Sequence, residues 1–171
     1  MKKVDFVYEC KILFMMLIYL FLGSIMEEYK KYITNEMEGL MSLKHKYTLF
    51  RKLWVIMASI QKDLGFEKIT DEMLQEMATH IDITDEDLIY ATQQERISKH
   101  DVMAQIAAFK KHLSPENSKY IHMCSTSAYV TDNTDMLIYI QALKIIENKL
   151  KELIINSIKL NASIAIIIPI K

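Results

Sequence analysis

The sequence predicts an all-α protein, and three observations support this. Only three glycines and two prolines occur in 171 residues, so few tight turns are available. The chain is rich in methionine, leucine, isoleucine, lysine and glutamate, which favour helices. In several segments apolar residues recur at spacings of three and four, the period of a helix with one buried face. Hydrophobic residues make up 51% and charged residues 25%, a composition typical of a folded protein rather than a disordered one.

The first predicted helix spans His45–Leu64, and Gly65 follows it as a candidate C-terminal cap. Its apolar positions share one face and are Leu49, Leu53, Ile56, Met57, Ile60 and Leu64. An amphipathic helix of this kind buries one side against other elements, so a helical core is expected around it.

Two threonines predict the starts of the next two helices. Thr70 is a candidate N-cap, and the acidic residues after it favour the helix dipole, so a second helix is expected to run to about His80. Thr84 repeats the signal, with Asp87 three residues on as a shorter relative of the capping box. The third predicted helix therefore covers about Asp85–Ile97.

A fourth helix is predicted over Asp101–His112, and its apolar stripe is Val102, Ile106 and Phe109. The segment 114–116, Ser-Pro-Glu, is a cap followed by proline at a first helical position, so it opens a short element. The stretch Tyr120–Val130 is rich in serine, threonine and tyrosine and predicts a loop.

A long helix is predicted from near Asp132 to about Asn156. Its apolar positions keep helical spacing throughout: Leu137, Ile140, Leu143, Ile146, Leu150 and Leu153. Long helices in small proteins usually pack in bundles. The following run Ile164–Ile170 contains Pro169, and a strand and an irregular end both stay open for it.

Charge and cysteine content exclude several function classes. The net charge of −1 gives no basic field for a nucleic-acid partner. The two cysteines, Cys10 and Cys124, lie far apart without a CxxC pair, so neither a disulfide framework nor a zinc ribbon is expected. The five histidines show no metal-binding spacing, so we expect no metal and no cofactor. A reduced intracellular compartment, the cytoplasm, fits best.

The N-terminal segment 1–30 is apolar and atypical. Ile12–Leu22 is an uninterrupted apolar run, shorter than the ~20 residues of a membrane span. Its length suits a signal peptide, but no cleavage-site pattern follows, and Asp5 and Glu9 interrupt the basic start. A helix without a targeting role, a gene-model or splice irregularity, and a signal or anchor all stay open. A membrane contact through 12–26 is less favoured than a position away from the membrane.

Two short segments carry polar groups suited to chemistry. Lys99, His100 and Asp101 lie between two predicted helices, where they could act in acid–base chemistry or bind an anion. The simpler interpretation makes Asp101 an N-cap and His100 a surface residue. The hydroxyl-rich segment 124–127 could hold a carboxylate or phosphate, or it could be an ordinary turn.

Taken together, these segments resemble adenylosuccinate lyases. Residues 99–104 (KHDVMA) are similar to that family's RHDVMAH motif, residues 121–127 to its IIHLGATS motif, and residues 129–135 to its YVGDNTD motif, in the same order. Upstream, residues 46–54 resemble a K(Y/F)xxxRxLW helix, and residues 69–77 resemble an ITDEQIxEM segment. The resemblance covers about His45 to about Asn156.

The resemblance implies a place in the fumarase/aspartase superfamily, whose members are all-α homotetramers. It implies a helical N-terminal domain over 31–125 and the first long helix of the fumarase/aspartase-type bundle over 126–160, with a divergent apolar tail at 161–171. The implied reaction is the β-elimination of fumarate from adenylosuccinate, giving AMP, and from a succinyl-carboxamide ribotide in purine synthesis. The implied partners are this small-molecule substrate and further copies of the chain through the helix 132–156.

Residue by residue, His100 and Asp101 match the family's active-site pair. His100 would contact substrate and help to orient the general acid. Thr126 and Ser127 match the pair that holds a substrate carboxylate, and Lys99 stands where the family has a substrate-binding arginine. This arrangement implies the substrate-binding part of a site that subunits share.

The departures from the family pattern are as informative as the matches. Lys99 keeps a charge but loses the arginine fork, and Cys124 replaces a loop glycine, which is expected to strain the turn. The family's P-L-x-S-R-Y-A-S segment is missing after Thr34, and neither its T-H-x-Q-P-A segment nor its mobile serine loop is present. We therefore expect a partial subunit that is inactive alone. The alternative is a non-catalytic helical module that pairs with full-length lyase subunits.

Overall fold

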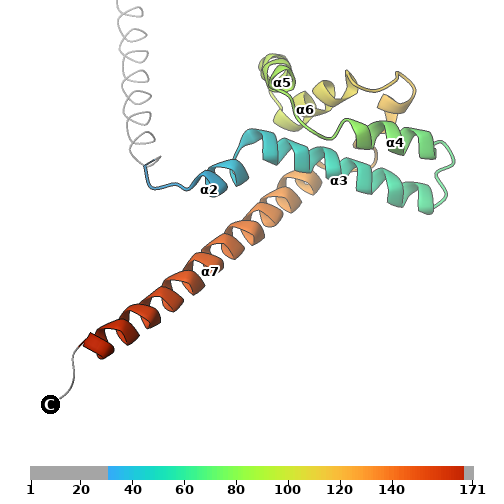
Figure 1. The fold of residues 1–171 in the computed structure, drawn as a ribbon. Coiled ribbons are helices and arrows are strands. Elements are labelled where there is room, and N and C mark those ends of the chain that lie inside the picture. The colour runs from blue at the N-terminus through green and yellow to red at the C-terminus, as the bar shows by residue number, and fades with distance from the viewer. Residues whose placement is uncertain (1–30, 168–171) are drawn as a thin grey trace, which may run out of the picture. The chain divides into compact units, whose positions relative to one another are not determined.

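The computed structural model describes residues 31–167 of the chain, and side chains up to residue 161, as helices joined by short loops (Figure 1). The prediction of an all-α fold is confirmed, because no strand occurs among these residues. The chain divides into two compact units, 1–38 and 39–171. The described helices are α2 (Asn35–Leu40), α3 (Leu43–Asp63), α4 (Asp71–Thr79), α5 (Asp85–Ser98), α6 (Asp101–Lys110), the 3₁₀ helix η1 (Asn117–Tyr120) and α7 (Ser127–Ile167).

The described part of the first unit, residues 31–38, contains the start of α2. Thr34 begins this short helix, since its Oγ1 accepts a hydrogen bond from the Met37 N–H at 3.3 Å and its carbonyl accepts one from Glu38. The sequence patterns did not predict α2. The apolar run Ile12–Leu22 lies outside the described residues.

Capping residues mark both ends of α3. The sequence pattern predicts the cap at the C-terminal end. Ser42 begins the helix by accepting a hydrogen bond from the His45 N–H at 3.2 Å. At the other end, Gly65 has φ = 94°, in the left-handed region, and its N–H donates to the Lys62 carbonyl. Glycine takes this conformation without steric cost, which is why the helix stops here.

The predicted caps of α4 and α5 are also confirmed. The Thr70 Oγ1 accepts from the Met73 N–H at 3.2 Å, and α4 starts one residue after Thr70. At α5, the Thr84 Oγ1 accepts from the Asp87 N–H at 3.2 Å while the Asp87 carboxylate accepts from the Thr84 N–H at 3.3 Å. This is a reciprocal capping box that satisfies two otherwise unpaired N–H groups.

The start of α6 differs from the simpler interpretation of Asp101 as an N-cap. His100 occupies the N-cap position without a side-chain hydrogen bond, and Asp101 is the first helical residue. The Asp101 carboxylate instead accepts from the Val102 N–H at 2.8 Å. The helix ends at Lys110, before the predicted end at His112.

The short element after α6 begins at Asn117, slightly later than predicted. The Ser114 Oγ accepts from the Asn117 N–H at 3.4 Å, in the manner of a cap. The Glu76 carboxylate of α4 accepts hydrogen bonds from the Ser114 N–H at 2.8 Å and from the Asn117 side chain. This carboxylate therefore fastens the turn to α4.

The prediction for α7 was wrong at both ends. The helix starts at Ser127 rather than near Asp132, inside the stretch predicted as a loop, and it continues to Ile167 as helix rather than as a strand or an irregular end. The polar side chains near its start bond back to the helix itself. Thr131 Oγ1 donates to the Ser127 carbonyl at 3.2 Å, and the Asn133 amide donates to the Tyr129 carbonyl at 2.7 Å. Thr131 and Asn133 therefore bond within the helix and do not act as its N-caps.

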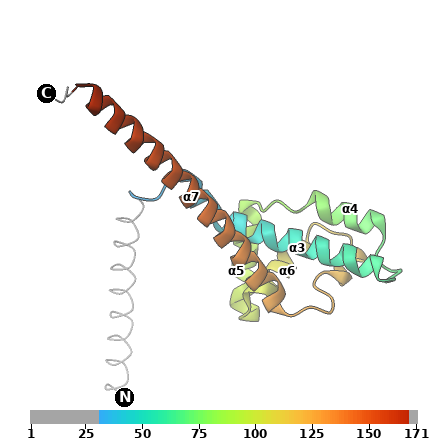
Figure 2. The ribbon, with the colours of Figure 1, turned by 90° about the horizontal axis from the view of Figure 1, so that it is seen from below.

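In the second unit, α4 lies along the second half of α3, and α7 packs against α3 before it runs away from the other helices (Figures 1 and 2). α5 and α6 pack on each other through small side chains, namely Ala91, Ala104 and Ala108. The α7 residues that face the rest of the unit form one stripe: Val130, Thr134, Ile138 and Ala142. Among the described residues, none of the helices combines the length and apolarity needed to cross a membrane.

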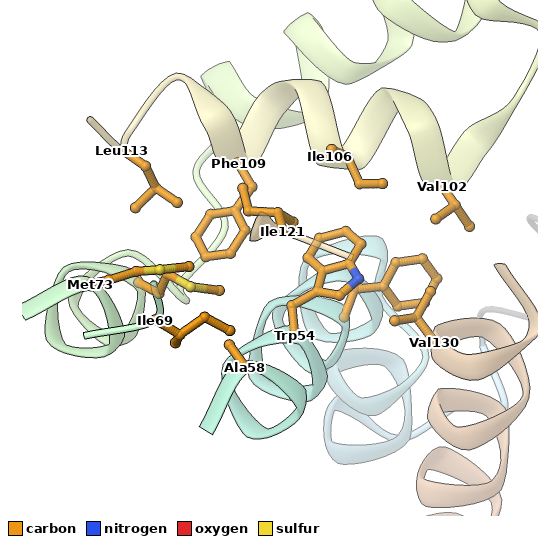
Figure 3. Packing of buried hydrophobic residues seen from close by; sticks show 12 residues of the cluster. Trp54, Ala58, Ile69, Met73, Val102, Ile106, Phe109, Leu113, Ile121 and Val130 are labelled. Carbon is orange, nitrogen blue, oxygen red and sulfur yellow. The ribbon is translucent and has the colours of Figure 1, made fainter. Parts of the chain in front are cut away.

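Trp54 occupies the centre of the main core (Figure 3). Its ring stacks on Phe109 of α6 with centroids 5.9 Å apart, and it meets Phe50 of α3 edge to face at 6.0 Å. Stacked and edge-to-face pairs are the favourable arrangements of aromatic rings. The core thus joins α3, α4, α6 and α7 around one fully buried indole.

A buried ionic network lies beside this core. The Arg51 guanidinium pairs with the Asp87 carboxylate at 3.0 Å and donates to the carbonyls of His80 and Asp82 at 2.7 and 3.1 Å. His112 Nε2 lies 2.6 Å from the other Asp87 oxygen. Burial acts to raise the pKa of Asp87, but the His112 hydrogen bond and the Arg51 charge outweigh it, and the pKa lies below its ordinary value.

Candidate functional site

The segment that joins α5 to α6 carries the first group of predicted site residues. Lys99 ends α5 in the left-handed conformation, with φ = 56°, and His100 follows in extended backbone. The His100 Nδ1 lies 3.5 Å from an Asp101 carboxylate oxygen, and both side chains are nearly half exposed. Lys99, His100 and Asp101 thus form a sharp corner that presents a histidine and a carboxylate at the start of α6.

The second predicted pair lies at the start of α7. Thr126 is exposed immediately before the helix, and Ser127 is its first residue and half-buried. The first N–H groups of a helix have no partner within the helix and carry partial positive charge. The hydroxyls of Thr126 and Ser127 therefore stand beside N–H donors that favour an anion.

The two helix starts lie at the same end of the core. Val102, one residue after Asp101, and Val130, in the first turn of α7, belong to one buried cluster and lie on the same side of Trp54 (Figure 3). Tyr47 of α3 faces this end too. Burial raises the pKa of Tyr47, and the negative charge of Asp101 adds to the effect.

His122 connects the two groups, and it received no role from the sequence patterns. Its Nδ1 accepts a hydrogen bond from the Trp54 Nε1–H at 3.0 Å, and the two rings meet edge to face at 6.0 Å. Burial lowers the pKa of His122, and the nearby charge of His100 lowers it further. The one available signal was a histidine placed between the apolar residues Ile121 and Met123 in a motif segment.

Cys124 confirms the expectation of a strained turn. It is exposed, has no disulfide partner among the described residues, and has φ = 57°, in the left-handed region. His122 has a positive φ of 62° as well, and its carbonyl accepts from the Ser125 N–H at 3.3 Å. An L-residue with a Cβ pays roughly 1–2 kcal/mol for this conformation, which explains why a glycine suits position 124.

The loop between η1 and α7 is anchored to α3 at a second point. The Gln61 side-chain amide donates to the Met123 carbonyl at 2.8 Å, while its buried carbonyl oxygen has no hydrogen-bond partner in the part of the chain that the structure describes. A shallow depression borders the α5–α6 corner, lined by Thr92, Glu95, Arg96 and Lys99. Within the described residues, no three His, Cys, Asp or Glu side chains are grouped so that they could hold a metal ion.

The arrangement is suited to binding an anionic ligand. It combines two hydroxyls at a helix start, the first backbone N–H groups of that helix and two histidines within one end of the molecule. Donors fixed by the fold in this way can also stabilise negative charge that develops during a reaction. Asp101 is the carboxylate at this end that directly adjoins His100.

Comparisons with known proteins show which proteins this chain is similar to. No protein-family model matches the chain. Adenylosuccinate lyase of Saccharomyces cerevisiae is 38% identical over 124 residues, which are 72% of this chain and 26% of the yeast protein. Adenylosuccinate lyase of Schistosoma mansoni is 37% identical over 117 residues, covering 68% of this chain and 24% of that protein. Adenylosuccinate lyase of Caenorhabditis briggsae is 40% identical over 101 residues, 59% of this chain and 20% of that protein.

These relatives share one name, and the similarity extends over most of this chain. The chain spans about a quarter of the length of the curated relatives that it matches. Over the matched residues, this chain is therefore homologous to a part of the adenylosuccinate lyases.

Proposed function

We propose that this chain supplies the substrate-binding part of an adenylosuccinate lyase site. The proposed reaction is the β-elimination of fumarate from adenylosuccinate, giving AMP, and from the succinyl-carboxamide ribotide of purine synthesis. The observation that carries the proposal is the position of both site pairs at the starts of helices, His100 and Asp101 at α6 and Thr126 and Ser127 at α7. We further propose the cytoplasm as the compartment.

Thr126 and Ser127 are proposed to hold a carboxylate of the succinyl group. Their hydroxyls and the free N–H groups at the start of α7 supply donors of the kind that a carboxylate accepts. Lys99 is proposed to add a positive charge from the α5–α6 corner. An ammonium attracts the substrate as a point charge, without the two parallel hydrogen bonds that an arginine fork gives.

His100 is proposed to contact the substrate and to orient the general acid. Asp101 lies 3.5 Å from its Nδ1 and favours one orientation of the ring. Removal of a Cβ proton creates a carbanion that fixed donors must stabilise, and an acid must protonate the leaving nitrogen. The matched residues do not include the family segments that carry this acid and the base, so the role proposed for His100 and Asp101 is confined to binding and orientation.

Ligand binding to the pure chain tests the proposal. In a titration with adenylosuccinate followed by amide resonances, we expect shifts at Ser127, His100 and their neighbours. The variant Ser127→Ala should weaken binding about 10- to 100-fold, because it removes one hydrogen bond to a charged group, which contributes roughly 1.5–3 kcal/mol. The control Ser157→Ala removes an exposed serine far along α7 and should bind as the original chain does. Shifts confined to other parts of the chain would contradict the proposal.

A second proposal concerns assembly through α7. After Ala142 the helix leaves the core, and its apolar side chains are exposed: Leu143, Ile146, Leu150, Leu153, Ile154, Ile155, Ile158 and Leu160. Exposed apolar patches of this kind mark interaction surfaces. We propose that 126–160 forms the first helix of a bundle shared with further copies of the chain or with full-length lyase subunits.

Sedimentation of the pure chain tests this assembly. We expect oligomers that dissociate in the double variant Leu150→Glu and Leu153→Glu. Association would bury the two introduced carboxylates and remove their hydration. The matched control replaces Lys149 and Lys151, which are exposed on the same turns, by glutamate and should retain the oligomers. A monomeric original chain would contradict this proposal but leave the binding proposal intact.

A further inference from the structure

Trp54 makes one polar contact from within the apolar core. Its side chain is completely buried, and its Nε1–H is the only polar group on the ring. A buried donor without an acceptor costs about 1–3 kcal/mol, so the acceptor matters. That acceptor is the His122 Nδ1, at 3.0 Å.

The chemistry of the two rings determines where the His122 proton lies. An indole N–H can only donate, so the His122 Nδ1 must offer its lone pair. A neutral imidazole whose Nδ1 is an acceptor carries its proton on Nε2. If the ring became an imidazolium, Nδ1 would also carry a proton, and two donors would face each other. The contact therefore selects one tautomer and opposes protonation.

Both partners are held in place from other directions. Trp54 is stacked on Phe109 and in edge contact with Phe50, so its ring cannot turn away without disturbing the core. The backbone after His122 is fastened to α3 by the Gln61 amide, which donates to the Met123 carbonyl at 2.8 Å. The pair is therefore arranged before any ligand arrives.

The surroundings of His122 favour the same protonation state. Burial lowers its pKa, and the charge of His100, from the start of α6, lowers it further. His122 is half-buried, and within the described part of the chain its Nε2 makes no hydrogen bond. Its N–H is thus available to a ligand.

We infer that Trp54 is a positioning residue, which keeps His122 neutral with its proton on Nε2 so that the ring donates one hydrogen bond to a carboxylate of the substrate beside His100. This inference rests on the proposed function for the identity of the ligand. A neutral donor set by the fold stabilises negative charge without rearrangement when the ligand binds. It also leaves His100 as the histidine of the pair that adjoins a carboxylate, Asp101.

Nitrogen resonances of the imidazole rings test the inference on the full chain. Long-range proton–nitrogen correlations of the ¹⁵N-labelled protein distinguish the two neutral tautomers and the imidazolium. We expect His122 in the Nε2–H form at neutral pH, with a titration midpoint below the ordinary histidine value. In Trp54→Phe the donor is gone, and we expect a mixture of tautomers with a higher midpoint. A purely structural role for Trp54 would not move this tautomer ratio.

The control variant Phe109→Leu loosens the same core but keeps the indole donor, so its His122 tautomer should match that of the original chain. An Nδ1–H tautomer or an imidazolium at neutral pH in the original chain would overturn the inference, even if Trp54→Phe does not fold. An unchanged tautomer in a folded Trp54→Phe would overturn it as well. Because this measurement needs no ligand, a failure to bind adenylosuccinate would contradict the proposed function separately.

Discussion

Two histidine–aspartate pairs in this molecule have opposite environments. His112 and Asp87 come from different helical segments and lie 2.6 Å apart, with the Asp87 side chain 3% exposed and its second oxygen on Arg51. His100 and Asp101 are neighbours in the sequence, lie 3.5 Å apart, and are 45% and 46% exposed. Both oxygens of Asp87 bind partners within the protein, whereas the His100 and Asp101 side chains retain capacity for a ligand. Residue type alone therefore does not separate a structural pair from a candidate site.

The largest expected effect comes from breaking the buried pair. Asp87→Ala removes the partner of the buried Arg51 charge and one half of the capping box, so we expect a loss of about 3–5 kcal/mol in the free energy of unfolding. Asp101→Ala is the matched control, and its loss should stay below about 1 kcal/mol because the residue is exposed. Urea denaturation followed by circular dichroism measures both. Equal losses would contradict the contrast between the pairs.

In acid, too, the larger loss of stability should come from the buried pair. The pKa of Asp87 is lowered in the folded chain, so the unfolded chain takes up this proton first as the pH falls. The stabilisation from Asp87 is therefore complete above the ordinary aspartate pKa and is lost as the pH falls through the lowered value. We expect the urea midpoint to drop as the pH falls below the ordinary aspartate pKa. Asp87→Ala should show a smaller drop, and an equal drop would assign the acid sensitivity to other groups.

A smaller effect is expected at the strained turn beside the candidate site. Cys124→Gly relieves a left-handed Cβ and should raise the free energy of unfolding by roughly 1 kcal/mol. Ser125→Gly, at the next position and without a positive φ, should give no gain. Thermal unfolding of the two variants compares them directly. A gain at both positions would contradict relief of strain at Cys124 as the cause.

Local chemistry made much of this fold predictable. The caps at Thr70, Thr84 and Gly65 depend on residues within three positions of the helix ends, so the sequence pattern located them well. The start of α7 was not predictable in this way, because Val130 in its first turn belongs to the buried cluster around the distant Trp54, a contact that only the folded chain makes.

The candidate site residues also divide into those that local motifs reveal and those that depend on contacts in the folded chain. The corner at His100 and the pair Thr126 and Ser127 could be singled out from short motifs. The burial of Asp87 could not, because its partners Arg51 and His112 are remote in the sequence. His122 was missed for the same reason, since its environment depends on Trp54, and only the folded chain brings these rings into contact.

Trp54 is the only tryptophan in the chain, and this gives the protein an intrinsic optical probe. Under excitation that tryptophan absorbs and tyrosine does not, its emission comes from one indole whose N–H is bonded to His122. A protonated imidazole at this distance quenches indole fluorescence, so the emission intensity follows the charge of His122 without any label. One fluorescence titration thus monitors the core and the edge of the candidate site together.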